Sequence, residues 1–357
     1  MSGRVHQLLS GAGAYDAITN QALDWQRELG DWGVAGSVFA AVMEPAVAGP
    51  VIPLSRLEKT LAPDDLLILH WSAQLRGHDR VLALPQRKLL VYHNITPPEF
   101  LWHHDPFVAL VCAVGRERLG AAAGLVEGAA AASEFNAADL RAAGMADVYV
   151  DPALYRFDRA RLRAGAGDVP PWGDDGTRTI AFVGRLSPNK RQDRLIRAFA
   201  LYQSELEPDS RLVLVGTAGS GTYGDWLERL AVATGARDVV MPGGIPQPAL
   251  NAIYAHADVF ACLSEHEGFC LPLLEALHFG LPVVASRAGG AVPEIAGDAA
   301  VMLDAPDLPT VAEAIDLVVC DTGLRAELAR RGERRLERHT PERTTAALRG
   351  FVEPHLG

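Results

Sequence analysis

The sequence predicts an α/β protein with two Rossmann-like domains facing each other across a cleft. Its 357 residues suit two domains of ~150–200 residues each. Short apolar runs alternate with segments of helical period, which is typical of parallel α/β architecture. A stretch rich in Gly, Pro and Asp divides these runs into two series. We therefore expect an N-terminal domain over 1–165, a linker over 166–178, a second domain over 179–339, and a C-terminal helix over 340–357 that packs back towards the N-terminal domain.

Each expected element follows from its local pattern. A helix is expected near Thr19–Leu29, and the last helix begins with Thr340 as N-cap and Pro341 in its first turn. Ligands of open parallel sheets bind beyond the carboxyl ends of the strands, so residues that follow strands are the first candidates for a site. The expected strands are Val5–Leu9, Val34–Ala41, Asp65–His70, Lys88–His93, Leu125–Ala131, Asp147–Val150, Thr179–Val183, Arg211–Val215, Asp238–Met241, Val259–Leu263, Pro282–Ala285 and Ala300–Leu303.

Composition excludes several classes of protein. With 49% hydrophobic and 22% charged residues the chain should be globular. A net charge of -11 argues against nucleic acid as a partner, although a nucleotide needs only a few local cations. No apolar run reaches the ~18 residues of a membrane span, and the first apolar stretch is too short for a secretory signal. The four cysteines lack CxxC spacing, which favours reduced thiols in a cytoplasmic protein over a zinc site or a disulfide framework. The sequence leaves the oligomeric state open.

The stretch SEHEGFCLPLLEALHFG, residues 264–280, carries two carboxylates separated by seven residues, Glu267 and Glu275. Pro272 suits the first turn of a helix that begins after the loop. The backbone N–H groups of Phe269, Cys270 and Leu271 would then lie at the helix N-terminus, which favours an anion. The two carboxylates can accept hydrogen bonds from sugar and ribose hydroxyls. Taken alone, they could equally be a loop charge and a helix charge facing solvent.

A second stretch, IAFVGRLSPNKRQDRLIRAF over 180–199, presents Arg185 and Lys190 just beyond a predicted strand. Arginine offers a planar fork and lysine a mobile point charge, and both suit a diphosphate. A solvated surface pair is the alternative without further context.

In the first half, SGAGAYDA forms a Gly-rich turn around Gly13, where backbone can approach a ligand closely. Asp16 stands where the dinucleotide fingerprint GxGxxG requires its third glycine, which makes an NAD-dependent oxidoreductase improbable. His70 and His93 each end a predicted strand. A lone histidine is more often structural, and the sequence favours a functional role for His93 over His70.

Several motifs in order, GRLSPNK, VGTAGSG and GGIPQPALNAIYAHADVFACLSEHEGFCLPLLEALHFGLPVVASRAGGAVPE, resemble the family 4 glycosyltransferases of the GT-B fold over about 120 residues. YHNITPPEF and ASEFN are similar to a subgroup that includes O-antigen mannosyltransferases. The resemblance implies an N-terminal acceptor-binding domain and a C-terminal domain that binds a nucleotide diphosphate sugar, GDP- or UDP-linked, with no other cofactor. It departs from the family at Cys270, where a glycine is usual.

The resemblance also implies residue roles. Arg185 and Lys190 would bind the diphosphate, Glu267 the transferred sugar and Glu275 the ribose, while His93 would lie near the reacting sugar. The expected catalytic residues are therefore His93, Glu267, Arg185 and Lys190, with no metal ligand. The expected donor-binding residues are Gly13, Gly216, Gly244, Ile245, Phe269, Cys270, Leu271 and Glu275.

The expected reaction is metal-independent transfer to an acceptor hydroxyl with retention of configuration. The absence of an Asp-x-Asp motif fits a diphosphate held by cations and a helix N-terminus. The acceptor is a small molecule or glycan, since acidic residues outnumber basic ones in the first 160 positions. A catalytically inactive nucleotide-sugar-binding protein, an epimerase and a phosphorylase on the same fold are the alternatives.

Overall fold

The computed structural model describes residues 3–14, 16–74, 77–170, 172, 175–219 and 221–356. Its contacts divide the chain into two units, each described by itself. Unit 1 comprises Met1–Pro98, Leu110–Arg156 and His339–Gly357, and unit 2 comprises Glu99–Ala109 and Phe157–Arg338. The chain thus passes to unit 2 at Phe157, before the predicted linker over 166–178, of which residues 171, 173 and 174 lie outside the described residues.

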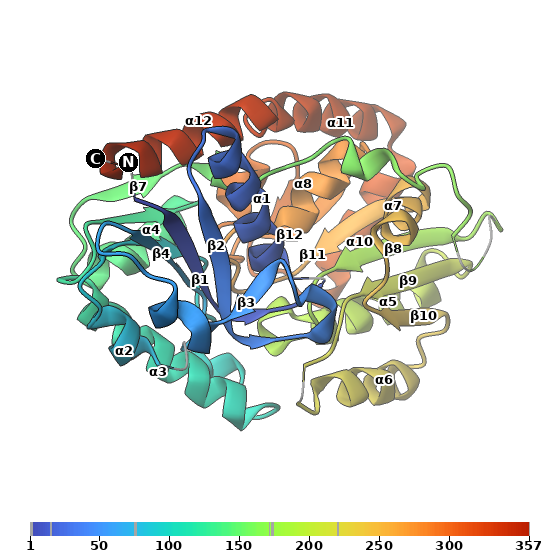
Figure 1. Cartoon of the computed structure of the whole chain (residues 1–357). Helices are drawn as coiled ribbons and strands as arrows, with labels where there is room; N and C mark the ends of the chain where they lie inside the picture. The colour runs from blue at the N-terminus through green and yellow to red at the C-terminus, as the bar shows by residue number, and fades with distance from the viewer. Residues whose placement is uncertain are drawn as a thin grey trace. The chain divides into compact units, whose positions relative to one another are not determined.

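Unit 1 is built on a seven-stranded parallel sheet in the order β3-β2-β1-β4-β5-β6-β7 (Figure 1). The chain reverses its direction of winding between β1 and β4, so the carboxyl ends of these strands form a topological switch point. Sequence analysis missed β3, an edge strand of three residues that ends in a proline. The strands are β1 Val5–Ala12, β2 Gly36–Met43, β3 Val51–Pro53, β4 Leu66–Trp71, β5 Arg87–Tyr92, β6 Gly128–Ala131 and β7 Val148–Val150.

The first and the last helix of unit 1 each begin at a polar side chain that caps them. The Asp16 carboxylate accepts from the Thr19 N–H at 2.8 Å, and Thr340 caps the last helix as predicted. That last helix contacts unit 1: the Arg349 guanidinium lies 4.7 Å from the ring centroid of Trp32. The helices are α1 Ala17–Asp31, α2 His78–Leu82, α3 Pro106–Ala122, which begins in the segment assigned to unit 2, α4 Glu134–Ala142 and α12 Pro341–Val352.

Unit 2 contains a six-stranded parallel sheet in the order β10-β9-β8-β11-β12-β13. Its switch point lies between β8 and β11. The strands are β8 Arg178–Val183, β9 Ser210–Val215, β10 Val239–Gly243, β11 Val259–Cys262, β12 Val283–Ser286 and β13 Val301–Leu303. The helices are α5 Gln192–Glu205, α6 Tyr223–Thr234, α7 Gln247–His256, α8 Leu271–His278, α9 Val292–Ala296, α10 Leu308–Cys320 and α11 Thr322–Leu336.

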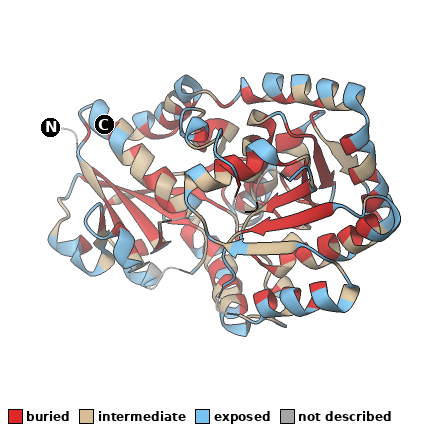
Figure 2. Ribbon diagram, turned by 90° about the vertical axis from the view of Figure 1, so that its right-hand side faces the viewer, coloured by how far each residue is buried: buried red, intermediate tan, exposed pale blue. Residues whose placement is uncertain are grey.

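Burial explains why the central strands read as continuous apolar runs. Strands β4, β9, β11 and β12 are buried along their whole length, as expected for parallel strands covered on both faces (Figure 2). The predicted fold class, two Rossmann-like α/β domains, is confirmed by the two sheets. In the part of the chain that is described, no helix has the length and apolarity needed to cross a bilayer.

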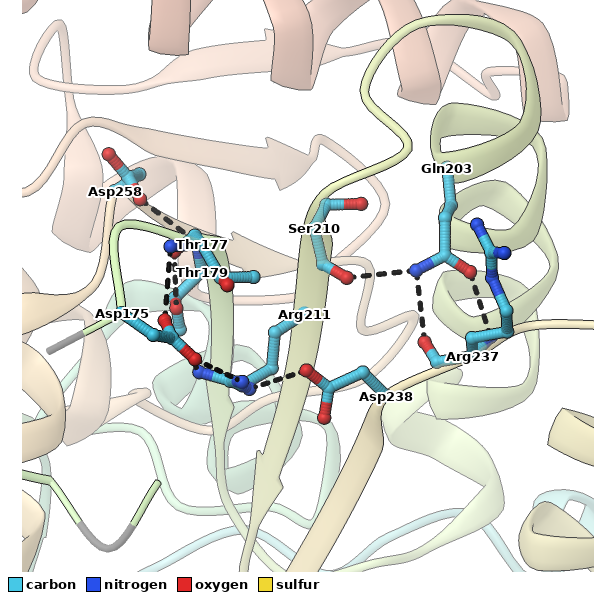
Figure 3. Close-up of polar contacts among 9 residues, drawn as sticks. All are labelled: Asp175, Thr177, Thr179, Gln203, Ser210, Arg211, Arg237, Asp238 and Asp258. Atoms are coloured by element: carbon cyan, nitrogen blue, oxygen red, sulfur yellow. Dashed lines mark hydrogen bonds and ion pairs between the residues drawn. The ribbon is translucent and has the colours of Figure 1, made fainter. Parts of the chain in front are cut away.

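A charged network lies at the amino-terminal edge of the second sheet, at the opposite ends of the strands from the switch point (Figure 3). The buried Arg211 donates from Nε to Asp238 at 2.7 Å and from Nη2 to Asp175 at 2.9 Å. Its guanidinium also lies 5.3 Å from the ring centroid of Trp172. Arg211 therefore ties the segment that precedes β8 to the start of β9 and β10.

We expect Arg211→Met to lower the melting temperature by about 3–6 °C, because a buried fork loses charge-assisted hydrogen bonds on two sides. Arg237→Ala is the matched control: the exposed Arg237 takes part in the network through its backbone N–H, which donates to Gln203 at 2.8 Å. Differential scanning calorimetry of both variants checks this. Equal melting temperatures for the two would contradict the role given to Arg211.

Candidate nucleotide-sugar site

The predicted site residues of unit 2 follow four neighbouring strands at their carboxyl ends. Gly244 and Ile245 follow β10, Gly216 follows β9, Arg185 follows β8, and Glu267 lies in the loop after β11. Because β10, β9, β8 and β11 are adjacent and parallel, the structure brings these loops to one edge of the sheet.

The loops after β8 and β9 run against each other, which explains the glycine at 216. The Leu186 N–H donates to the Thr217 carbonyl at 3.0 Å. A Cβ on Gly216, whose φ is 149°, would lie 2.0 Å from the Gly184 carbonyl oxygen. Only glycine allows this close approach. Its primary role in the structure is thus to let the two loops pass.

Lys190 and Glu267 form an ion pair across the switch point. The Lys190 ammonium donates to Glu267 Oε2, and Ser264 Oγ donates to Glu267 Oε1 at 2.8 Å. The side chains of Lys190 and Glu267 are 18% and 7% exposed, so the pair is largely removed from water. Both carboxylate oxygens of Glu267 are therefore held in place by loops from two different strands.

Asn189 joins the same two loops and was missed by sequence analysis. Its Nδ2 donates to the His266 carbonyl at 2.9 Å, and its own carbonyl accepts from the Glu265 N–H at 2.9 Å. Asn189 is 2% exposed. Its place inside the GRLSPNK motif, between a proline turn and Lys190, was the available signal. Sequence analysis also missed Ser264, although it is the first residue of the stretch over 264–280.

Arg185 differs from Lys190 in its surroundings. Its side chain is exposed, and among the described residues its guanidinium has no ion-pair or hydrogen-bond partner. Its backbone carbonyl accepts from Gln192 Nε2 at 3.0 Å, which fixes the main chain of the loop. The planar fork is thus available to an external anion, on the same loop as Lys190.

Cys270 begins α8 with left-handed backbone, φ 74° and ψ 63°. This conformation favours glycine, which agrees with the glycine that the family resemblance implies at this position. The Cys270 side chain makes no capping hydrogen bond, and Pro272 lies in the first turn. Phe269 is buried, whereas Leu271 is half-buried at the start of the helix. The N-terminus of α8 therefore directly follows the loop that carries Glu267.

Glu275 is positioned by Tyr254 of α7, a residue that sequence analysis missed. Tyr254 Oη donates to Glu275 Oε2 at 2.9 Å, and its ring stacks on Phe279 with centroids 5.6 Å apart. Burial raises the pKa of Glu275, and burial with the neighbouring Glu275 raises the pKa of Tyr254. An aromatic residue at a helical core position reads as packing alone, so this contact needed the structure.

Gly13 and His93 belong to unit 1, whereas the other predicted site residues belong to unit 2. Gly13 follows β1, and a Cβ there would lie 2.8 Å from Glu44 Oε1. Glu44 also accepts from the Ala14 N–H at 3.1 Å. The Gly-rich turn therefore already faces a carboxylate of its own unit, and negative charge beside it disfavours a phosphate.

His93 belongs to a buried hydrogen-bonded chain. Its Nε2 lies 2.8 Å from His70 Nδ1, its Nδ1 lies 2.7 Å from Tyr155 Oη, and His70 Nε2 lies 2.9 Å from Gln7 Oε1. Gln7 Nε2 donates to the Ala22 carbonyl, so Gln7 Oε1 is the atom that faces His70 and accepts from its Nε2. With both imidazoles neutral, Tyr155 donates to His93, His93 to His70 and His70 to Gln7. Both ring nitrogens of His93 are thus engaged within unit 1.

This chain predicts acid sensitivity. Burial lowers the pKa of His70 to about 3, and burial followed by repulsion from His70 lowers the pKa of His93 well below its ordinary value. Below pH ~6.5 the unfolded chain takes up protons that the folded one does not. The contribution of these neutral histidines to stability is therefore complete above pH ~6.5 and is lost progressively as the pH falls towards 3. For His70 alone the loss is roughly 2 kcal/mol at pH ~5.

Thermal unfolding between pH ~7.5 and ~5 measures this effect. We expect the melting temperature to fall on acidification in the wild type and to fall less steeply in His70→Asn. His256→Asn, which replaces an exposed histidine of α7, is the control. A flat profile in the wild type would contradict a neutral buried pair.

Comparison with known proteins supports the assignment of unit 2. Residues 172–335 match the family model described as glycosyl transferases group 1. A GDP-mannose-dependent alpha-(1-6)-phosphatidylinositol monomannoside mannosyltransferase of Mycolicibacterium smegmatis is 37% identical over 173 residues, which is 46% of this chain and 42% of the relative. A D-inositol 3-phosphate glycosyltransferase of Salinispora arenicola is 36% identical over 180 residues, 47% of this chain and 39% of the relative. The matches thus span less than half of these relatives' length.

Solved structures match over nearly the whole chain. Anabaena HepE in complex with UDP and glucose superposes with a TM-score of 0.73 at 18% identity, covering 98% of this chain and 99% of that one. Sucrose-phosphate synthase from Thermosynechococcus elongatus gives 0.70 at 19% identity, covering 99% of each chain. At this identity the likeness concerns the fold, and it confirms the predicted GT-B class.

Proposed function

We propose, from the match of residues 172–335 to the family described as glycosyl transferases group 1, that the chain is a retaining glycosyltransferase. It transfers a sugar from a nucleotide diphosphate donor to a hydroxyl of an acceptor, without a divalent metal ion. Unit 2 binds the donor at the carboxyl ends of β8–β11, and unit 1 binds the acceptor.

One observation carries the proposal. The largely buried Lys190–Glu267 pair lies at the switch point, and the loop that carries Lys190 also carries the exposed Arg185, whose guanidinium has no partner within the described part of the chain. Two cations supplied by one strand end suit a diphosphate, which carries adjacent negative charges. The carboxylate of Glu267 is already oriented by Lys190 and Ser264 and can accept a sugar hydroxyl. This is an arrangement for an anion joined to a polyol.

The residues suggest how the reaction proceeds. The bond between the sugar C1 and the diphosphate oxygen breaks through an oxocarbenium-like transition state, and negative charge grows on the leaving phosphate. Arg185, Lys190 and the N-terminus of α8 stabilise that charge. Retention follows from attack of the acceptor on the face that the phosphate leaves, with the phosphate taking the acceptor proton. Glu275, oriented by Tyr254, accepts from the ribose.

The two predicted site residues of unit 1, His93 and Gly13, stay in the proposal, and the role of His93 changes. His93 is retained as a residue near the reacting sugar, but its engaged ring nitrogens favour a role in which it shapes the acceptor side instead of moving a proton. Gly13 is retained as a point of close backbone approach. A cytoplasmic location belongs to the same proposal, since none of the four described cysteines, Cys112, Cys262, Cys270 and Cys320, is in a disulfide.

The donor base is addressed by a thermal-shift screen with GDP-mannose, UDP-glucose and other GDP- and UDP-sugars. The curated relatives include GDP-mannose-dependent enzymes, and the solved neighbours include a UDP complex. We expect one base series to raise the melting temperature and to support transfer to an acceptor panel. Stabilisation by a nucleotide sugar without transfer to any acceptor would favour a binding protein that has lost activity.

A further inference from the structure

Two thiols and a carboxylate meet beside the proposed donor site. Cys262 ends β11, Glu267 lies in the following loop and Cys270 begins α8. One ligand atom from each lies within 4.8 Å of the other two. Ser264 Oγ completes the group, 3.4 Å from Cys262 Sγ and 2.8 Å from Glu267 Oε1. Cys262 and Cys270 do not have CxxC spacing in the sequence. The end of a strand, a loop and a helix N-terminus bring them together in the fold.

This donor set suits a thiophilic divalent cation. Zinc takes tetrahedral sites of thiolate, imidazole and carboxylate ligands, with sulfur atoms about 3.8 Å apart at Zn–S distances of about 2.3 Å. The three ligand atoms, all within 4.8 Å of one another, lie within reach of a single ion. Water or Ser264 would supply the fourth ligand.

The charge balance is also favourable. Two thiolates and the Glu267 carboxylate carry three negative charges, and a divalent cation together with the Lys190 ammonium carries three positive ones. All three ligand residues are buried, so an ion bound there would be shielded from water and from competing anions. Cys270 has left-handed backbone, which costs a residue with a side chain more free energy than it costs glycine. The thiol is thus present at a position where glycine would be less strained.

We propose that Cys262, Glu267 and Cys270 form an inhibitory site for zinc or another thiophilic divalent cation. This inference rests on the proposed function in one respect: the metal ligand Glu267 is also the residue assigned to the transferred sugar. Metal binding displaces the thiol protons, engages the carboxylate and weakens its pairing with Lys190. Metal and donor therefore exclude one another, and the transfer reaction itself needs no metal.

The test begins with binding of Zn²⁺ alone, measured by isothermal titration calorimetry on the full chain. Cys320→Ser is the background, because this removes the exposed thiol that would bind metal adventitiously. Adding Cys262→Ala should weaken Zn²⁺ binding by more than about 100-fold, since loss of even an outer-shell partner costs 10–100-fold. Cys270→Gly, which suits the positive φ, should weaken it similarly. Adding Cys112→Ala, a buried thiol outside the cluster, should leave it unchanged.

Cadmium supplies a second readout, because ligation by thiolates gives an ultraviolet charge-transfer band. The band should appear in the Cys320→Ser background and be lost with Cys262→Ala. Equal Zn²⁺ affinity with and without Cys262, or loss of binding with Cys112→Ala instead, overturns the proposal.

Competition with the donor is measured separately. Saturating Zn²⁺ should raise the donor Kd at least tenfold in the Cys320→Ser background, and much less when Cys262→Ala is added. The same Zn²⁺ concentration in both proteins controls for metal bound by the nucleotide. Zn²⁺ bound at the cluster by a protein that binds no nucleotide sugar would sink the proposed function alone, whereas donor transfer with no Zn²⁺ at the cluster would sink this inference alone.

Discussion

Replacing Arg185 by alanine should lower turnover by at least ~10²-fold, the usual cost of removing one donor to the charge that develops in a transition state. The reason lies in its surroundings: Arg185 is exposed on the loop that also carries Lys190, and its guanidinium has no partner among the described residues. Its loss therefore removes a contact to the donor without breaking one inside the protein. Steady-state kinetics with the nucleotide sugar found in the screen measures the effect.

Two further variants make this result specific. Arg185→Lys retains the charge but loses the fork, so its turnover should lie between that of Arg185→Ala and the wild type. Arg197→Ala removes an exposed arginine of α5 and should leave turnover unchanged. Turnover of Arg185→Ala close to that of the wild type would remove this residue from the site.

Glu267→Gln should lower kcat by about 10²-fold or more with a smaller change in KM. The carboxylate is held on both oxygens, by Lys190 and by Ser264, so the exchange for an amide changes charge and hydrogen bonding while keeping the shape. Lys190, only 18% exposed, would then face a neutral group and lose its fixed position. Since the sugar gains positive charge in the transition state, loss of the neighbouring negative charge is felt mainly in kcat.

Glu265→Gln is the matched control in the same loop. Glu265 pairs with Arg191 instead of Lys190, and its side chain is 30% exposed. We expect near-normal kinetics for this variant. If the two substitutions reduced kcat equally, the effect would come from the loop as a whole, and the specific role of Glu267 would be lost.

Local sequence patterns were sufficient to predict the parallel sheets and the strand ends that carry Arg185, Gly216 and Glu267. The reason is physical: buried parallel strands are apolar throughout, and polar motifs that interrupt them must lie in the loops beyond. The pattern could not reveal β3, because three residues ending in proline carry no period.

Contacts between distant residues were not predictable. Tyr254 holds Glu275 although the two are on different helices, and the chain from Tyr155 to Gln7 depends on the register of several strands. The strand-end position of His93 favoured a functional role but could not show that both of its ring nitrogens are engaged. The sequence predicts on which element a side chain lies, but its hydrogen-bond partners depend on the packing of elements that are distant in the sequence.

The crystal structure of the protein with GDP or UDP bound would test the central claim most directly. We predict the diphosphate against Arg185, Lys190 and the N-terminus of α8, with the ribose at Glu275. A nucleotide bound elsewhere, or Arg185 and Lys190 turned away from its phosphates, would contradict the account.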